Sequence, residues 1–295
     1  MTLSFDFAFE GFRLIRQRPK LILFWGLLSL IGNSAITAIL AGMAGPALAS
    51  LAHMQGQAPD QQTALSLMSR IMPAMMTSLP IYVLMSAVLS AAICRAVGGD
   101  SDDRFGFLGF GKRECLLIAL EIVMLLLRAV AMTGFLVFGE LASQILPGAA
   151  GEALLSLFSL AGMGVVLWLS VRLSLNTAQT FDEGRLNLWG SFELSRERFW
   201  TLLIGYATAF GLALVVMFLC KQIIDGALVI ASGMTSAKGS DALDLSSLPA
   251  LAAPSSLIYL ALSGGVMSPL TASILMGAPI SAYRAIRAQR KPLTA

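Results

Sequence analysis

Charged residues are scarce in this sequence of 295 residues. They make up 13% of it, whereas hydrophobic residues make up 57%, and the mean hydropathy is +0.79. A soluble domain has roughly 25% charged and 45–50% apolar residues, so a soluble core could not bury the surplus. Apolar stretches of about 20 residues instead match a hydrocarbon layer about 30 Å thick. The composition therefore predicts an all-α, polytopic transmembrane bundle with no room for a separate soluble catalytic domain.

Residues that bind metals or carry nucleophilic chemistry are also few. The sequence has one histidine, His53, and three cysteines, Cys94, Cys115 and Cys220, which do not have the spacing of metal ligands. We therefore predict no metal site, no cofactor and no disulfide framework. No serine stands in a nucleophile elbow, and no glycine-rich run matches a phosphate loop, so we predict that the protein is not an enzyme.

Hydropathy predicts about six spans, separated by polar loops of which the longest covers 45–70. The predicted spans cover about 21–43, 73–97, 114–138, 154–175, 199–220 and 251–286. The last of these would be about 54 Å long as a helix, and its prolines and glycines predict a kinked or broken helix. The predicted organisation is a cytoplasmic interfacial helix at 1–20, a six-span transmembrane domain at 21–286 and a cytoplasmic tail at 287–295.

The distribution of lysine and arginine predicts the orientation. Sixteen of these 20 residues fall in the N-terminal segment, the second and fourth loops and the tail, all on one side of the predicted spans. Cytoplasmic loops carry this excess, so both termini are predicted to be cytoplasmic. The net charge of +3 is spread beside the spans rather than gathered in one patch, and we therefore predict no nucleic-acid partner.

Two amphipathic segments precede predicted spans one and five. In the first, over 4–18, phenylalanines recur at helical spacing near several arginines, and in the second, over 176–198, apolar and charged residues alternate. This pattern predicts interfacial helices that grip lipid headgroups. The predicted headgroup contacts are Arg13, Arg16, Arg18, Arg196 and Arg198.

Glu121 and Arg128 fall inside the third predicted span. A charge at a helix centre costs about 2.5–3.5 kcal/mol on insertion scales unless it is compensated. The two residues share a helix face but lie about 10 Å apart along the axis, which is long for a direct pair. Either they line a substrate or proton pathway, or they form a polar clasp with other helices. The candidate clasp partners are Asn33, Tyr206, Thr208, Ser268 and Thr271.

The segments FAFEGFRLIRQRPKLILFWG, over 7–26, and LWGSFELSRERFWTLLIG, over 188–205, resemble a group of bacterial six-helix inner-membrane proteins. That group includes the membrane domain attached to some glycerophosphoryl diester phosphodiesterases. The resemblance implies a six-helix architecture in the bacterial inner (plasma) membrane. Enzyme-bearing members continue into a soluble catalytic barrel, whereas this sequence ends at Ala295, so we expect no phosphodiesterase activity.

These observations favour a non-enzymatic integral membrane protein that organises lipid or a partner protein at the inner leaflet. The expected partners are membrane lipids, together with another membrane protein or further copies of the same chain. The alternative is a small transporter or channel that uses Glu121 and Arg128, because interrupted helices often build binding sites near the middle of the membrane.

Overall fold

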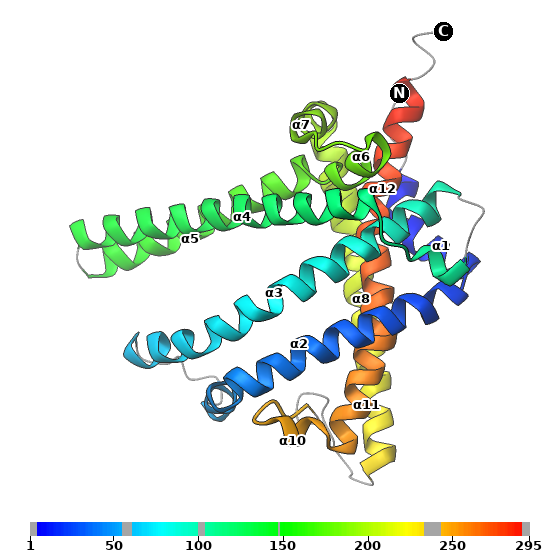
Figure 1. Cartoon of the computed structure of the whole chain (residues 1–295). Helices are drawn as coiled ribbons and strands as arrows, with labels where there is room; N and C mark the ends of the chain where they lie inside the picture. The colour runs from blue at the N-terminus through cyan, green and yellow to red at the C-terminus, as the bar shows by residue number, and fades with distance from the viewer. Residues whose placement is uncertain (1–4, 55–60, 100–103, 147, 233–242, 291–295) are drawn as a thin grey trace. The chain divides into compact units, whose positions relative to one another are not determined.

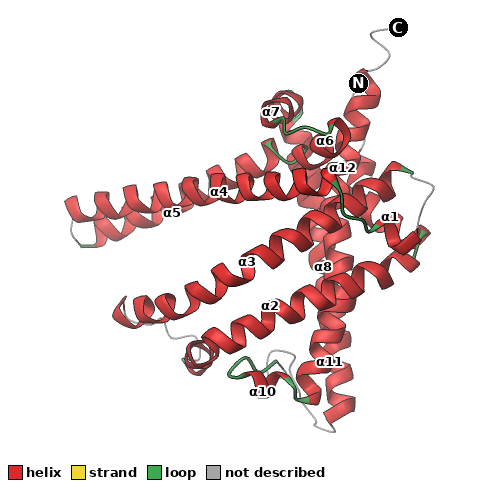
Figure 2. Ribbon diagram, viewed as in Figure 1, coloured by secondary structure: helices red, strands yellow, loops and turns green. Residues whose placement is uncertain are grey.

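The computed structural model describes residues 5–54, 61–99, 104–146, 148–232 and 243–290. Throughout these residues the chain consists of helices joined by loops, and Figure 2 shows no strand among them. Six of the helices are long and apolar enough to cross a membrane. The predicted all-α polytopic class and the six spans are therefore confirmed.

The long helices are α2 (Lys20–His53), α3 (Gln61–Gly98), α4 (Lys112–Ile145), α5 (Ala149–Arg172), α8 (Phe199–Ser232) and α12 (Ser268–Arg290). Four of them, α2, α3, α4 and α8, extend well beyond the predicted spans, whereas α5 ends three residues before its predicted end and the last predicted span is divided among shorter helices. At 1.5 Å per residue, a helix of 34 residues such as α2 is about 51 Å long. The predicted loop at 45–70 was wrong over most of its length, because its alanine, leucine, methionine and glutamine residues sustain a helix outside an apolar layer.

The fifth span likewise continues as a helix past its predicted end. Lys221 and Asp225 follow the apolar stretch of α8, and they form an ion pair across one turn, with 3.1 Å between Nζ and Oδ2. Pairs of opposite charge at this spacing stabilise a helix in water. On the other side of this part of α8, Ile224 and Leu228 are buried against α11 (Pro254–Leu262).

The predicted second interfacial helix is two helices, α6 (Asn176–Glu183) and α7 (Leu188–Arg196). The first of these is buried at most of its positions, so the expectation of a single surface helix over 176–198 was wrong. Gly184 ends α6 in the left-handed conformation, at φ +65°, which glycine adopts without strain. The Asn187 side chain accepts a hydrogen bond from the Gly190 N–H at 3.0 Å and caps α7.

The last apolar segment is helical from Pro254 onward but changes its winding. Between α11 and α12 lies a π-helical segment, η3 (Ser263–Met267), which interrupts the α-helix. A π-bulge absorbs an extra residue in a helix and is a recognised cause of kinks. The structure thus shows an interruption of the α-helical winding at this segment, and the predicted kink stays a prediction. The helix α12 continues to Arg290, and residues 291–295 of the predicted tail lie outside the described residues.

The remaining short elements lie beside the long helices. At the N-terminus, η1 (Phe5–Phe9) leads into α1 (Glu10–Gln17), which ends just before the first span. A short turn, η2 (Arg104–Phe107), precedes α4, and α10 (Leu248–Leu251) precedes α11.

In the loop before α10, hydrogen bonds from the side chain and the backbone N–H of Ser246 lower the pKa of Asp244.

The helices form two compact units. One unit comprises residues 1–8, 110–207 and 278–295, and the other comprises residues 9–109 and 208–277. Within the first unit, α4 and α5 run side by side as an antiparallel hairpin, and α6 packs against α4 (Figure 1). Within the second unit, α2 packs against α3 and against η3.

Candidate functional site

Glycines set the distance between α4 and α5. A Cβ atom added to Gly139 would lie 2.9 Å from Cβ of Phe158, and one added to Gly162 would lie 2.9 Å from Cβ of Phe135. Small residues of this kind let two membrane helices approach closely. In the antiparallel hairpin, Gly139 thus lies beside Phe158 and Gly162 beside Phe135.

That register places Glu121 and Arg128 at different levels of the hairpin. The Asn176 amide contacts the Met124 sulfur, with 4.0 Å between Nδ2 and Sδ, and Asn176 is the first residue of α6. Glu121 comes almost one turn before Met124, so it lies beyond the C-terminal end of α5. Arg128 comes one turn after Met124 and therefore lies beside the last turns of α5.

The structure does not bring the two charged residues together. Glu121 is half-buried, whereas Arg128 is exposed and forms no ion pair or hydrogen bond within the part of the chain that the structure describes. Two of the candidate clasp partners bond elsewhere: the Tyr206 hydroxyl lies 2.8 Å from that of Ser174, and Thr271 donates to backbone carbonyls of its own helix. Neither of these two contacts supplies Arg128 with a partner.

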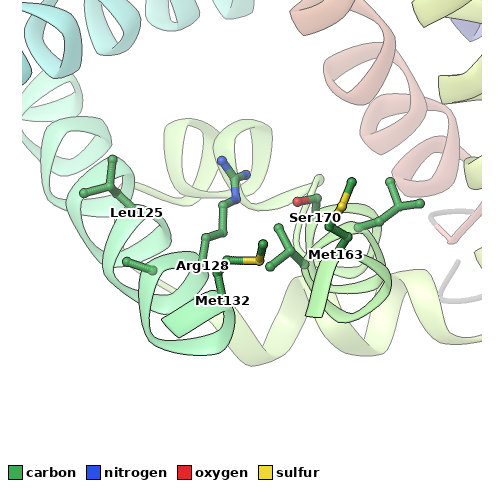
Figure 3. A pocket seen from close by; sticks show the side chains of 8 residues that line it. Leu125, Arg128, Met132, Met163 and Ser170 are labelled. Atoms are coloured by element: carbon green, nitrogen blue, oxygen red, sulfur yellow. The ribbon is translucent and has the colours of Figure 1, made fainter. Parts of the chain in front are cut away.

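Arg128 borders a groove between α4 and α5 with a volume of about 630 Å³. Apart from Arg128 and Ser170 its lining is apolar, and Figure 3 shows these two side chains on the facing helices. The lining residues are Leu125, Arg128, Ala129, Met132, Met163, Val166, Leu167 and Ser170. A cavity of this size falls in the usual range for ligand pockets, roughly 300–1,000 Å³.

Arg172, the last residue of α5, is held among three aromatic rings. Its Cζ atom lies 5.6 Å from the ring centre of Trp168, 5.1 Å from that of Phe192 and 5.2 Å from that of Phe199. Its Nε and Nη1 atoms are buried without a hydrogen-bond partner, so the ring faces supply the compensating attraction.

The backbone of Arg172 also anchors α7. Its carbonyl oxygen accepts hydrogen bonds from the hydroxyl groups of Ser191, at 3.2 Å, and Ser195, at 3.0 Å. Both serines are fully buried. The opposite side of α7 is exposed and carries Trp189 and Arg196. Together these contacts fasten a short amphipathic helix to the end of a membrane span.

The predicted headgroup residues differ in their surroundings. Arg13, Arg16 and Arg196 are exposed, and Arg13 pairs with Glu10 at 3.6 Å. Arg18 is partly buried, with its Cζ atom 5.3 Å from the Phe107 ring centre. The described structure does not test whether these residues touch lipid, and their role stays a prediction.

Little in the sequence indicated the surroundings of Arg198 and Arg172 in the folded protein. Arg198 is partly buried, and its Nη1 atom has no hydrogen-bond partner. Arg172 counted in the sequence only as one of the basic residues that set the orientation. One signal of its role was available, because Trp168 precedes it by four residues and therefore shares its helix face. Nothing local indicated that Phe192 and Phe199 would complete the cage.

A second, smaller cavity of about 220 Å³ lies among α6, α7 and α12. Polar contacts surround it: Asp182 pairs with Arg287, and the carboxylate of Glu183 accepts hydrogen bonds from Gln179, at 2.9 Å, and Arg185, at 3.0 Å. These interactions join the end of α12 to α6. In the described residues, no group of three or more histidine, cysteine, aspartate or glutamate side chains is placed to hold a metal ion.

The fold and these contacts define the class of the protein. Six apolar helices identify it as a multi-pass integral membrane protein. Comparisons with models of known protein families, with curated proteins and with solved structures find no match.

Proposed function

We propose that the protein is a non-enzymatic component of the bacterial inner membrane that binds anionic lipid headgroups at the cytoplasmic surface. The observation that carries the proposal is the attachment of α7 to the end of α5. Ser191 and Ser195 hold the buried side of α7 against Arg172, while Trp189 is 79% exposed on the other side. An exposed tryptophan together with an exposed arginine on a short helix beside a span is typical of a membrane interface.

The N-terminal segment supports the same proposal independently. Leu14 and Ile15 of α1 are buried, whereas Phe12 is about half exposed and Arg13 and Arg16 are exposed. Phenyl rings beside exposed guanidinium groups suit the boundary between acyl chains and headgroups. Each basic residue close to an anionic surface contributes about 1 kcal/mol to the attraction.

The proposed orientation has both termini in the cytoplasm. The excess of basic residues supports it, since 16 of the 20 lysines and arginines fall in the N-terminal segment, the second and fourth loops with their flanks, and the tail. The resemblance of the segments at 7–26 and 188–205 to bacterial six-helix membrane proteins supports the assignment to the inner membrane. Another membrane protein or a second copy of the chain remains a proposed partner.

The proposal is tested by measuring the phosphatidylglycerol that co-purifies with the full chain. The double variant Arg196→Gln, Arg198→Gln should retain several-fold less of this anionic lipid than the unchanged protein, because two positive charges are removed from the proposed cytoplasmic surface. Lys221→Gln is the matched control, since it removes one positive charge from the proposed outer side. Equal lipid content in all three proteins would contradict the proposal.

A second candidate function is a small transporter or channel that uses Glu121 and Arg128. The exposed Arg128 side chain beside the groove favours it, because unpaired charges within spans often mark ion or substrate pathways. Vesicles that contain the protein and an internal pH-sensitive dye would report proton flux. Flux that disappears in Glu121→Gln would support this candidate, and vesicles as tight as empty ones would contradict a proton pathway.

A further inference from the structure

We infer that the groove between α4 and α5 is a specific site for one anionic phospholipid, with its phosphate on Arg128 and Ser170 and part of an acyl chain along the groove. This inference deepens the proposed function, because it assigns one bound lipid to a defined place instead of a general affinity for the surface. It rests on the proposed orientation of the chain.

The first argument is the unsatisfied charge of Arg128. The guanidinium group is exposed on an apolar helix and forms no ion pair or hydrogen bond in the residues described. A phosphate suits the planar guanidinium because it accepts two parallel hydrogen bonds.

The second argument is the depth of the polar end of the groove. With 24 residues, α5 is about 36 Å long, close to the thickness of the hydrocarbon layer plus a margin at each side. When α5 itself crosses that layer, Ser170, two residues before its C-terminal end, lies near the headgroups. Side chains on an α-helix lean toward its N-terminus, so Arg128 leans along α4 toward that same level. Both polar groups of the groove therefore lie where a lipid phosphate lies.

The third argument is the shape and chemistry of the rest of the groove, away from Arg128 and Ser170. From Ser170 to Met163 the groove extends about 10 Å along α5 toward the middle of the membrane. Its lining there is apolar, and it contains the flexible side chains of Met132 and Met163. Methionine adapts to irregular apolar surfaces, so an acyl chain with or without a double bond can be accommodated. A polar end followed by an apolar channel matches one amphiphile and not a soluble anion.

The test is native mass spectrometry of the full chain in a neutral detergent, titrated with dioleoyl phosphatidylglycerol or with dioleoyl phosphatidylcholine. The unchanged protein should bind its first phosphatidylglycerol at least about tenfold more tightly than its first phosphatidylcholine, as expected for a charged hydrogen bond. Arg128→Gln should abolish that difference. Arg128→Lys should keep part of it, because lysine retains the charge but not the paired geometry.

A second pair of variants tests the acyl-chain part. Ala129→Trp fills the groove and should remove the first bound lipid of either type, whereas Val130→Trp, at a position 71% exposed on the neighbouring face, should not. Each variant is first checked for a melting temperature and a monomeric mass equal to those of the unchanged protein. If Ala129→Trp instead alters the oligomeric state or the stability and leaves lipid binding intact, the groove packs against another helix, and the inference is overturned.

Two further results separate this inference from the proposed function. If Arg128→Gln binds both lipids as the unchanged protein does, while Arg196→Gln with Arg198→Gln lowers total lipid, the groove site is refuted and the proposed function stands. If only the Arg128 variants change the first binding step, the groove site stands and the surface role of α7 fails. Displacement of the first lipid by soluble glycerol 3-phosphate would show recognition of phosphate alone and would overturn the acyl-chain assignment.

Discussion

Gly26 of α2 meets Gly265 of the π-helical segment backbone to backbone. A Cβ atom on Gly26 would lie 2.2 Å from the carbonyl oxygen of Gly265, far inside contact distance. The two helices therefore touch only because Gly26 has no side chain. Gly264 of the same segment also lies close to α2, since a Cβ atom on it would be 3.3 Å from Cα of Leu30, whereas one on Gly265 itself would meet nothing within 4 Å.

The first prediction concerns this contact. Gly26→Ala should destabilise the protein by about 1–3 kcal/mol, because the methyl group forces α2 away from η3. Gly211→Ala in α8 is the matched control, since nothing lies within 4 Å of its added Cβ. Alanine is the better helix former, so the control should be neutral or more stable by up to about 1 kcal/mol. Thermal unfolding in detergent measures both, and equal melting temperatures would contradict the packing.

The second prediction concerns Trp25, which is fully buried at the start of α2. Its indole N–H donates a 2.8 Å hydrogen bond to the carbonyl oxygen of Gly106, in a turn where three successive residues have positive φ. Trp25→Phe leaves that oxygen without its donor and should cost about 1–3 kcal/mol. Trp200→Phe, at a side chain 72% exposed, should change little. Identical melting curves for the two variants would show that the turn does not depend on Trp25.

The third prediction concerns the cage around Arg172. Arg172→Gln removes the attraction to Trp168, Phe192 and Phe199, each worth about 0.5–2 kcal/mol. The backbone carbonyl that anchors α7 is unchanged, so α7 should loosen without detaching. Hydrogen exchange at the α7 amides should rise in this variant and rise further when Ser191→Ala and Ser195→Ala are added. Arg185→Gln, an exposed side chain, is the control, and unchanged exchange in the cage variant would argue against an anchoring role.

The fourth prediction concerns orientation. With the three native cysteines replaced by alanine, Arg185→Cys and Asp244→Cys place single thiols in two described loops, one before α7 and one before α10. A maleimide that cannot cross the membrane should label position 244 in spheroplasts and position 185 only after the membrane is opened. The reverse pattern would place both termini outside the cell and would remove the proposed cytoplasmic lipid contacts.

The sequence by itself determined the class of the protein, the six spans and the segments that precede two of them. Hydropathy and helical period depend only on residues that are close in the sequence. A chain that crosses lipid must satisfy its backbone N–H and C=O groups internally, and an α-helix does this within one segment. The same reasoning misjudged where helices end, since α2 and α3 include most of the polar residues at 45–70. Hydropathy detects only the part of a helix that lies in the hydrocarbon layer, and a helix can continue beyond that layer with polar residues.

Tertiary structure alone decided which side chains meet. Arg172 acquires its cage from residues 4, 20 and 27 positions away in the sequence, and Arg128 gains its groove from the register in which Gly139 and Gly162 let α4 and α5 pair. The helical period of the sequence shows which residues share a face of a helix, but the element that this face contacts depends on the packing of the whole bundle. For that reason the basic residues were visible in the sequence, while the sites they build became visible only in the fold.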